Sequence, residues 1–391
     1  MSDAAMGAVA GFTSTGSKRP EALFGEPQAD LPRTMVRSSG CRVWDAEGRE
    51  YLDFIMALGA VALGYGHPDV NAAAVRAIGD GVVGPLPPAL EGELALDLRR
   101  LIPWVEQVRF LKTGAEAMAA AVRLARTATG REAVLGCGYH GWLDWCQGPE
   151  ARGVPAGTRA LYAELPFNDA ERTRELIGRA GDTLAAVVFE PVILEPPQPE
   201  WLAVLREETT RTGAVLIADE IKTIGRLAIG GACERFDLRP DLVVMGKAIA
   251  NGFPLAAVGG RADLMAGVAR TWISSTLATE FVSLAAARAT LAVLRDRRVP
   301  EQLGRIGAWL MDGFRGLAHR HPRHVRGVAG VPEMCNLVFH DEATGARVAA
   351  EAARRGVLFK RSAYNFVSMA HGEREIERAI GVLGEVLEGM K

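Results

Sequence analysis

Two residues of opposite charge, Asp219 and Lys247, stand at the ends of short apolar segments of the chain. Both segments are rich in Val, Leu and Ile and are closed by Gly or Pro, which is typical of strands in a sheet covered on both faces. Open parallel sheets bind ligands at the carboxyl ends of their strands. Because an ionised group that leaves water needs a partner to offset its lost hydration, we expect a ligand site between Asp219 and Lys247.

Lys247 has the residue type and the position of a nucleophilic amine. A lysine at the end of an apolar strand is partly desolvated, which lowers its pKa and makes a neutral amine available for a Schiff base. Asp219 needs a cationic partner or strong donors, and a protonated pyridine nitrogen would supply one. Spacing alone leaves a second interpretation open, in which Asp219 and Lys247 simply pair with each other across the sheet.

A phosphate site and a stacking ring are predicted at two further strand ends. The pattern of residues 110–119 predicts a strand, a tight Thr113-Gly114 turn and a helix, whose free N–H groups and positive dipole end form a phosphate cradle. The same turn also suits an ordinary helix N-terminus capped by Thr113. Tyr139 ends another strand and offers a ring for a planar heterocycle. Cradle, ring, carboxylate and lysine are together what pyridoxal 5'-phosphate requires.

A mainly parallel sheet is needed to bring these residues together. The apolar segments end at Glu190 and Asp219, which are 29 residues apart, and Lys247 follows 28 residues later. That spacing is the length of a strand, a return helix and two loops, so we predict an α/β fold. After about Trp272 the pattern changes to that of a smaller α+β lobe. The predicted parts are an N-terminal segment of residues 1–60, a large domain of residues 61–290 and a small C-terminal domain of residues 291–391.

Composition excludes several kinds of partner. The 391 residues carry 45 Lys and Arg against 47 Asp and Glu, a net charge of -2 that gives no reason to expect nucleic acid or an anionic membrane. The five cysteines are scattered and contain no CxxC pair, so neither a disulfide framework nor a metal site is predicted. No basic leader and no membrane-length apolar segment is present. We therefore expect a soluble protein of the reducing cytoplasm.

Seven motifs resemble, in order, those of the class III aminotransferases of fold type I, and within that group the glutamate-1-semialdehyde aminomutase branch. They span residues 43 to 287, and a weaker match, GVLFKRSAYNFVSMAH, lies near the end. The motifs are WDAEGREYLDF, TGAEAMAAAVRLAR, YHGW, FEPV, LIADEIKTIGR, PDLVVMGKAIANGFPLAAVGG and STLATEFVSLAAA. The resemblance implies a large domain with a mainly parallel seven-stranded sheet, a smaller α+β C-terminal domain, and pyridoxal 5'-phosphate as cofactor.

The resemblance also implies the catalytic residues. Lys247 would form the Schiff base with the cofactor, and Asp219 would hold its pyridine nitrogen protonated. Tyr139 would stack on one face of the ring, with Ile221 packed on the other.

Phosphate contacts follow from the same resemblance. Gly114 and Ala115 would give backbone N–H groups to the phosphate. Thr276 would donate its hydroxyl to the phosphate of the partner subunit's cofactor, which implies a homodimer with shared active sites. The same motifs place four more residues among those that bind the cofactor: Thr113, His140, Glu190 and Lys222.

Three departures from these relatives bear on the substrate. Lys222 stands where relatives more often have Met or Gln, and it could hold the phenolic oxygen of the cofactor, hold a substrate carboxylate, or lie on the surface. Glu195 stands near the place of an asparagine that contacts the phenolic oxygen in relatives. Arg361 or Lys360 could bind an acidic substrate at the entrance.

The predicted activity is that of an aminotransferase acting between a small-molecule amino donor, an amine or amino acid, and a keto or aldehyde acceptor. The alternative is an isomerase on the same scaffold, either a glutamate-1-semialdehyde-type aminomutase or an amino acid racemase. A non-catalytic dimer is disfavoured because the lysine, the aspartate, the stacking ring and the phosphate turn are all present.

Overall fold

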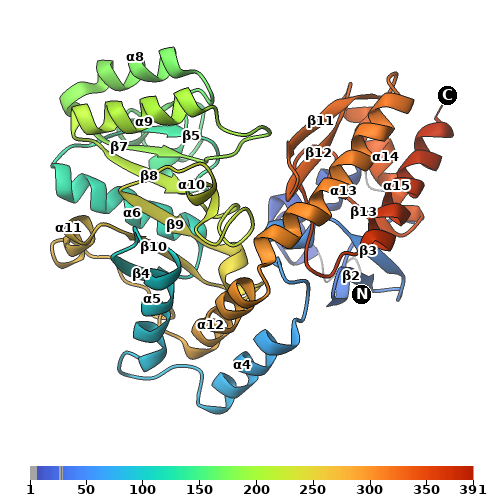
Figure 1. The fold of residues 1–391 in the computed structure, drawn as a ribbon, viewed down its shortest axis with the longest axis horizontal. Helices are drawn as coiled ribbons and strands as arrows, with labels where there is room; N and C mark the ends of the chain where they lie inside the picture. The colour runs from blue at the N-terminus through green and yellow to red at the C-terminus, as the bar shows by residue number, and fades with distance from the viewer. Residues whose placement is uncertain (1–6, 26–27, 29, 391) are drawn as a thin grey trace. The chain divides into compact units, whose positions relative to one another are not determined.

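The computed structural model describes residues 7–25, 28 and 30–390. By contacts the chain divides into two compact units, which Figure 1 shows coloured along the sequence. One unit comprises residues 68–300. The other comprises the described residues before 68 together with those after 300.

The unit of residues 68–300 is built on a seven-stranded sheet with the order β4-β10-β9-β8-β7-β5-β6. Four strand pairs are parallel, namely β5 with β6, β5 with β7, β7 with β8, and β8 with β9. Strand β10 is antiparallel to both of its neighbours. This confirms the mainly parallel seven-stranded sheet. The strands are β4 (Gln107–Leu111), β5 (Ala133–Cys137), β6 (Tyr162–Glu164), β7 (Leu184–Phe189), β8 (Val215–Asp219), β9 (Leu242–Met245) and β10 (Ala256–Gly260).

Helices cover both faces of this sheet, as Figure 1 shows. On β8, Ile217 belongs to the core that includes helix α6, whereas Leu216 and Ala218 belong to the core of α8 and α9. This alternation is the two-residue period of a strand, and burial on both sides explains why β8 is a continuous apolar segment. The helices are α4 (Pro68–Gly79), α5 (Ala89–Leu101), α6 (Gly114–Thr129), α7 (Ala156–Arg159), α8 (Ala170–Ala180), α9 (Pro199–Thr212), α10 (Gly231–Arg235), α11 (Ala262–Met265) and α12 (Phe281–Asp296).

Six of the seven strands end at the same edge of the sheet. Strands β5, β6, β7, β8 and β9 run in one direction. Because β10 is antiparallel to both β9 and β4, strand β4 runs in that direction too. The loops after these six strands therefore open at one edge, where open α/β sheets bind their ligands.

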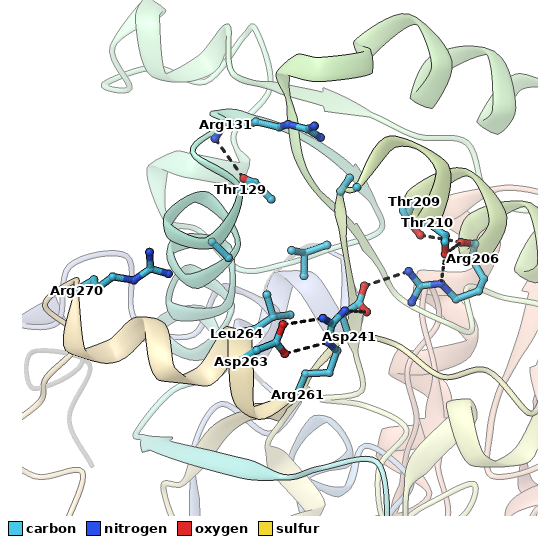
Figure 2. Close-up of a pocket in the computed structure, with 14 residues that line it drawn as sticks. Thr129, Arg131, Arg206, Thr209, Thr210, Asp241, Arg261, Asp263, Leu264 and Arg270 are labelled. Carbon is cyan, nitrogen blue, oxygen red and sulfur yellow. Dashed lines mark hydrogen bonds and ion pairs between the residues drawn. The ribbon is translucent and has the colours of Figure 1, made fainter.

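The opposite edge is fixed by an arginine and aspartate network around a hollow of about 640 Å³, shown in Figure 2. Asp241 accepts hydrogen bonds from the Leu216 N–H at 2.8 Å, from Arg206 at 3.1 Å and from Arg261 at 3.0 Å. Arg261 also contacts Asp263 at 2.7 Å. Since the charges of this network are matched within the protein, and since the C-terminal ends of α6 and α9 also line the hollow, we assign it a structural role.

The other unit contains two small sheets. Strands β2 and β3 form an antiparallel hairpin. Strand β13 pairs in parallel with β3, which is why the N-terminal residues fold with the C-terminal ones. The elements are α2 (Pro20–Phe24), β1 (Met35–Ser39), β2 (Arg42–Asp45), β3 (Glu50–Asp53), α3 (Met56–Gly59), α13 (Val299–Arg320), β11 (Val325–Val331), β12 (Met334–Phe339), α14 (Glu342–Arg354), β13 (Val357–Leu358), β14 (Asn365–Phe366) and α15 (Glu373–Glu388). No helix in the described part of the chain is long and apolar enough to cross a membrane.

Candidate active site

The carboxyl edge of the sheet brings the predicted catalytic residues to one place. Asp219 is the last residue of β8, and Lys247 follows β9 after one glycine. Tyr139 and His140 lie in the loop after β5, and Glu190 directly follows β7. Helix α6, with the predicted phosphate turn, begins after β4.

Asp219 is held by hydrogen bonds within the protein. Its Oδ2 lies 2.8 Å from Nδ1 of His140, and its Oδ1 accepts the Ile221 N–H at 3.2 Å. The His140 ring is fully buried and stacks on Trp145 at a centroid distance of 6.2 Å and an interplanar angle of 21°. No ion pair joins Asp219 to Lys247 within the described residues, so the alternative of a direct pair is not found.

Lys247 is strained and poorly solvated. Its φ of 47° lies in the left-handed region, which residues with a Cβ rarely adopt and which recurs at functional sites. Burial lowers the pKa of Lys247 to about 8, the positive charge of Lys222 acts in the same direction, and Asp219 and Glu190 oppose both effects. At pH 7 a pKa near 8 leaves about one amine in ten neutral, against fewer than about one in a thousand for an ordinary lysine.

Glu190 joins three of the strand-end segments. Its Oε1 accepts the Tyr139 N–H at 2.6 Å, and its Oε2 forms an ion pair with the ammonium group of Lys222. The Lys222 side chain is four-fifths buried and Glu190 is almost completely so. Lys222 therefore belongs to this cluster and is not a solvated surface lysine.

The start of α6 is capped by Thr113 and also leaves two backbone donors unoccupied among the described residues. Thr113 caps the helix by accepting the Glu116 N–H at 3.2 Å, and Glu116 accepts the Thr113 N–H at 2.9 Å, a capping box. For the next two residues, Gly114 and Ala115, no acceptor of the backbone N–H lies among the described residues. These two donors at the positive end of a helix can receive an anion.

Two glycines pack the loop after β5 against its neighbours. Gly138 and Gly141 have φ of 106° and 101°. A Cβ on Gly138 would lie 2.7 Å from Cγ of Glu190, and one on Gly141 would lie 2.7 Å from Cβ of Ala115. The loop is thereby wedged between the end of β7 and the start of α6. Tyr139 leaves this loop with its side chain 73% exposed, as a ring that stacks on a ligand must be.

Ile221 packs against the phosphate turn. A Cβ on Gly114 would lie 2.6 Å from Cδ1 of Ile221. The resemblance to the class III aminotransferases implies that Ile221 packs on one face of the cofactor ring, and this contact sets it between the end of β8 and the start of α6. The position is compatible with that role, which stays a prediction.

Four other candidates complete the predicted set. Oε1 of Glu195, in the loop after β7, accepts a hydrogen bond from Asn168 at 3.0 Å. Thr276 is exposed in the segment before α12. Lys360 and Arg361 belong to the other unit. The roles of these four residues stay predictions.

Two further buried ionisable residues were not among the predicted site residues. Arg226 is fully buried, and its charge contributes to the low pKa of Lys247. Glu220 accepts the N–H groups of Ala232 at 2.8 Å and Cys233 at 2.6 Å, so it binds the start of α10. Burial raises the pKa of Glu220. Both lie in loops, where no periodicity shows which side chains point inward.

Among the described residues, no group of three or more His, Cys, Asp and Glu side chains could hold a metal ion.

The chain is similar to known proteins in both sequence and structure. The sequence profile described as "Aminotransferase class-III" matches residues 24–372. A glutamate-1-semialdehyde 2,1-aminomutase of Thermomicrobium roseum is 37% identical over 400 residues, covering 92% of each chain. The structure of FumI from Sphingopyxis sp. MTA144, in its PLP internal aldimine form, aligns with a TM-score of 0.92 and 26% identity over 99% of this chain and 94% of that one. An omega-transaminase from Sphaerobacter thermophilus aligns with a TM-score of 0.89 and 27% identity over 99% and 96%.

Proposed function

Because this chain belongs to the class III aminotransferase family, whose enzymes use pyridoxal 5'-phosphate, we propose that it is an aminotransferase acting between an amine or amino acid and a keto or aldehyde acceptor. The observation that carries this proposal is the arrangement of Asp219 and Lys247. They lie at the ends of adjacent parallel strands, yet Asp219 is bonded to His140 and Lys247 has no ion-pair partner among the described residues. A group that needs a carboxylate at one end and an amine at the other fits between them.

The donor set fits pyridoxal 5'-phosphate. Asp219 would hold the pyridine nitrogen, and the free N–H groups of Gly114 and Ala115 would receive the phosphate. Tyr139 presents an open ring for one face of the cofactor, and Ile221 an apolar side chain for the other.

The chemistry divides between the cofactor and the protein. When bound, pyridoxal 5'-phosphate supplies the electron sink for the pair left by a broken Cα–H bond of the donor. Lys247 would take that proton as a neutral amine and return it as an ammonium group, a role worth roughly 10²- to 10⁴-fold in rate. The low pKa of Lys247 suits this role because both protonation states are accessible near neutral pH.

We also propose that the enzyme is a homodimer with shared active sites, in which Thr276 donates to the partner's cofactor phosphate. Large apolar side chains are exposed on the unit of residues 68–300, with Trp272 79% and Leu86 77% accessible. Val75 and Ile78 are exposed on one helix, α4. Apolar surface of this kind marks an interaction site, and a second copy is the commonest partner.

A reducing cytoplasm remains our proposed location, since all five cysteines are free thiols.

The second candidate function is an isomerase. It is favoured by the 37% identity to an enzyme that is described as an aminomutase. An aminomutase moves the amino group within one molecule, whereas a transferase transfers it to a separate acceptor. The two activities therefore differ in whether an added keto acid is consumed.

A screen of amino donors tests the proposal. Each amine or amino acid is added to the holoenzyme, and the absorbance change that marks formation of pyridoxamine phosphate is followed. A transferase then consumes an added keto acid in stoichiometric amount. Conversion of a single amino ketone or amino aldehyde without keto-acid consumption would establish the isomerase, and no spectral change with any donor would remove the support for amino transfer.

A further inference from the structure

We propose that Lys112 is a positioning residue for the partner subunit's cofactor site, because through Glu280 it holds the segment of residues 272–280 in which Thr276 lies. The inference rests on the proposed function in taking Thr276 as the donor to the partner's cofactor phosphate. Lys112 itself belongs to the strand, turn and helix that would receive the phosphate of its own subunit's cofactor. One element of the fold thereby serves two cofactor sites.

The first anchor of the segment is an ion pair. Lys112, the residue between β4 and the phosphate turn, contacts Oε1 of Glu280 at 2.6 Å. Its ammonium group also donates to the Pro254 carbonyl at 3.1 Å. The side chains of Lys112 and Glu280 are only 14% and 11% exposed. Water therefore gives neither charge a substitute for its partner, and the pair has few alternative positions.

Glu280 passes this constraint to Thr276. Its carboxylate accepts two N–H groups in the first turn of α12, at 2.6 and 3.0 Å, and so caps that helix. Its own N–H donates to the Leu277 carbonyl at 3.2 Å. The Ala278 N–H donates to the Ser275 carbonyl at 3.2 Å, which closes a turn that contains Thr276. The position of Thr276 is thus tied to that of Glu280 by consecutive backbone hydrogen bonds.

Two arginines hold the other end of the segment. Nη2 of Arg109, on β4, donates to the Ile273 carbonyl at 2.5 Å, and Nη1 of Arg123, on α6, donates to the Trp272 carbonyl at 2.7 Å. The segment, all of which the structure describes, contains no helix or strand, so side-chain contacts hold it in place. Thr276 lies between the two anchors and is exposed. A segment held at both ends and open at its centre presents this hydroxyl outward in a defined position.

The subunit's own phosphate turn does not depend on the Lys112 side chain. Glu116 accepts the backbone N–H groups of Lys112 at 3.2 Å and of Thr113 at 2.9 Å. Because these bonds use the main chain of Lys112, a change of its side chain leaves them in place. The effect of Lys112 is therefore expected in the partner's site and not in its own.

Two hybrid dimers, isolated by different affinity tags, test the proposal. Each contains one Lys247→Ala subunit, so only the other subunit can give the visible absorbance of cofactor bound as a Schiff base. The first hybrid carries Lys112→Met on the Lys247→Ala subunit, and the second carries it on the subunit that retains Lys247. We expect the first to bind pyridoxal 5'-phosphate about tenfold more weakly than a hybrid without Lys112→Met, and the second to match that hybrid.

Two further variants separate positioning from a general loss of structure. Lys112→Arg in the first hybrid keeps the charge that pairs with Glu280 and should restore most of the affinity. Arg123→Met leaves the buried ion pair intact and removes one exposed hydrogen bond, to the Trp272 carbonyl. In the same place as Lys112→Met in the first hybrid, it should weaken binding by a smaller factor, and it provides the test if Lys112→Met does not fold.

Weaker binding in the first hybrid alone supports the proposal. Unchanged binding in both hybrids, or weaker binding in the second, overturns it. A hybrid with Thr276→Val in place of Lys112→Met distinguishes this inference from the shared active site. If Thr276→Val weakens binding there and Lys112→Met does not, the shared site stands and the positioning role of Lys112 fails. Because cofactor binding needs no amino donor, the test is independent of the donor screen.

Discussion

Nδ1 of His140 lies 2.8 Å from Oδ2 of Asp219, and both side chains are almost completely buried. The imidazole fixes one oxygen of the carboxylate, while the Ile221 N–H fixes the other. The Asp219 carboxylate is thus held in one orientation. If Asp219 binds the cofactor as proposed, His140 would set the direction of that contact without having to touch the cofactor itself.

The first prediction concerns this hydrogen bond. His140→Leu removes the donor to Asp219, and a hydrogen bond to a charged group is worth about 1.5–3 kcal/mol. We expect affinity for pyridoxal 5'-phosphate to fall about 10- to 100-fold, measured by titrating the cofactor-free protein and following its visible absorbance. His340→Leu is the control, because His340 is exposed and its ring Nε2 lies 3.0 Å from the Pro322 carbonyl oxygen instead of bonding a carboxylate. Equal affinities for both variants would show that His140 does not position Asp219.

The second prediction concerns pH and stability. The folded pKa of Lys247, about 8, lies below its value of 10.5 in the absence of structure. Between these values the unfolded chain binds more protons, so the free energy of unfolding rises with pH. Below about pH 8 both states are protonated, and the unfavourable burial of the ammonium group is fully present.

Comparison with Lys247→Met isolates this contribution. From pH 7 to pH 9.5 the unsubstituted, cofactor-free protein should gain about 2 kcal/mol relative to Lys247→Met, measured by urea unfolding. Lys112→Met, which removes another partly buried lysine, should follow the pH dependence of the unsubstituted protein. A constant difference between the protein and Lys247→Met would mean that the pKa of Lys247 is not lowered.

Local pattern was sufficient to place the strand ends. Apolar segments closed by turn residues predicted β8 and β9, and a strand's end fixes where the residue after it lies. Asp219 and Lys247 could therefore be assigned to one edge of the sheet before the strand order was known. The Thr113 turn was ambiguous for a physical reason, since a capped helix start and an anion cradle use different groups of the same residues.

Side-chain pairing was not predictable. Glu190 and Lys222 follow adjacent strands, but Lys222 lies in a loop, where no period indicates its direction. The same limit applied to Glu195, whose hydrogen bond with Asn168 the sequence pattern did not indicate. Long polar side chains reach in several directions, and the neighbouring loops decide which partner they meet.

The third prediction uses the contact between Gly114 and Ile221. In Gly114→Ala the new Cβ would lie 2.6 Å from Cδ1 of Ile221, and such overpacking costs about 1–3 kcal/mol. Ile221→Val removes Cδ1 and so relieves this overlap. The double variant should therefore lose about 1 kcal/mol less free energy of unfolding than the sum of the losses in the two single variants. Urea unfolding of the four proteins measures this coupling. Additive effects would contradict the packing of Ile221 on the phosphate turn.

The fourth prediction tests the shared active site. Thr276→Val removes the hydroxyl proposed to reach the partner's cofactor phosphate, so this variant should bind the cofactor about 10- to 100-fold more weakly. A dimer in which both subunits carry Lys247→Ala should be inactive.

A hybrid of the two variants, isolated by different affinity tags, distinguishes the possible arrangements. If each site combines Lys247 of one subunit with Thr276 of the other, one of the two hybrid sites carries both substitutions and the other carries neither. At limiting cofactor, the hybrid should then show about half of the unsubstituted dimer's activity, more than either parent. If Thr276 acts within its own subunit, one hybrid site carries Lys247→Ala and the other carries Thr276→Val. The activity of the hybrid should then be half of the activity of the Thr276→Val dimer. Because the two arrangements place the same substitutions differently, the measurement decides between them even if Thr276→Val has only a moderate effect by itself.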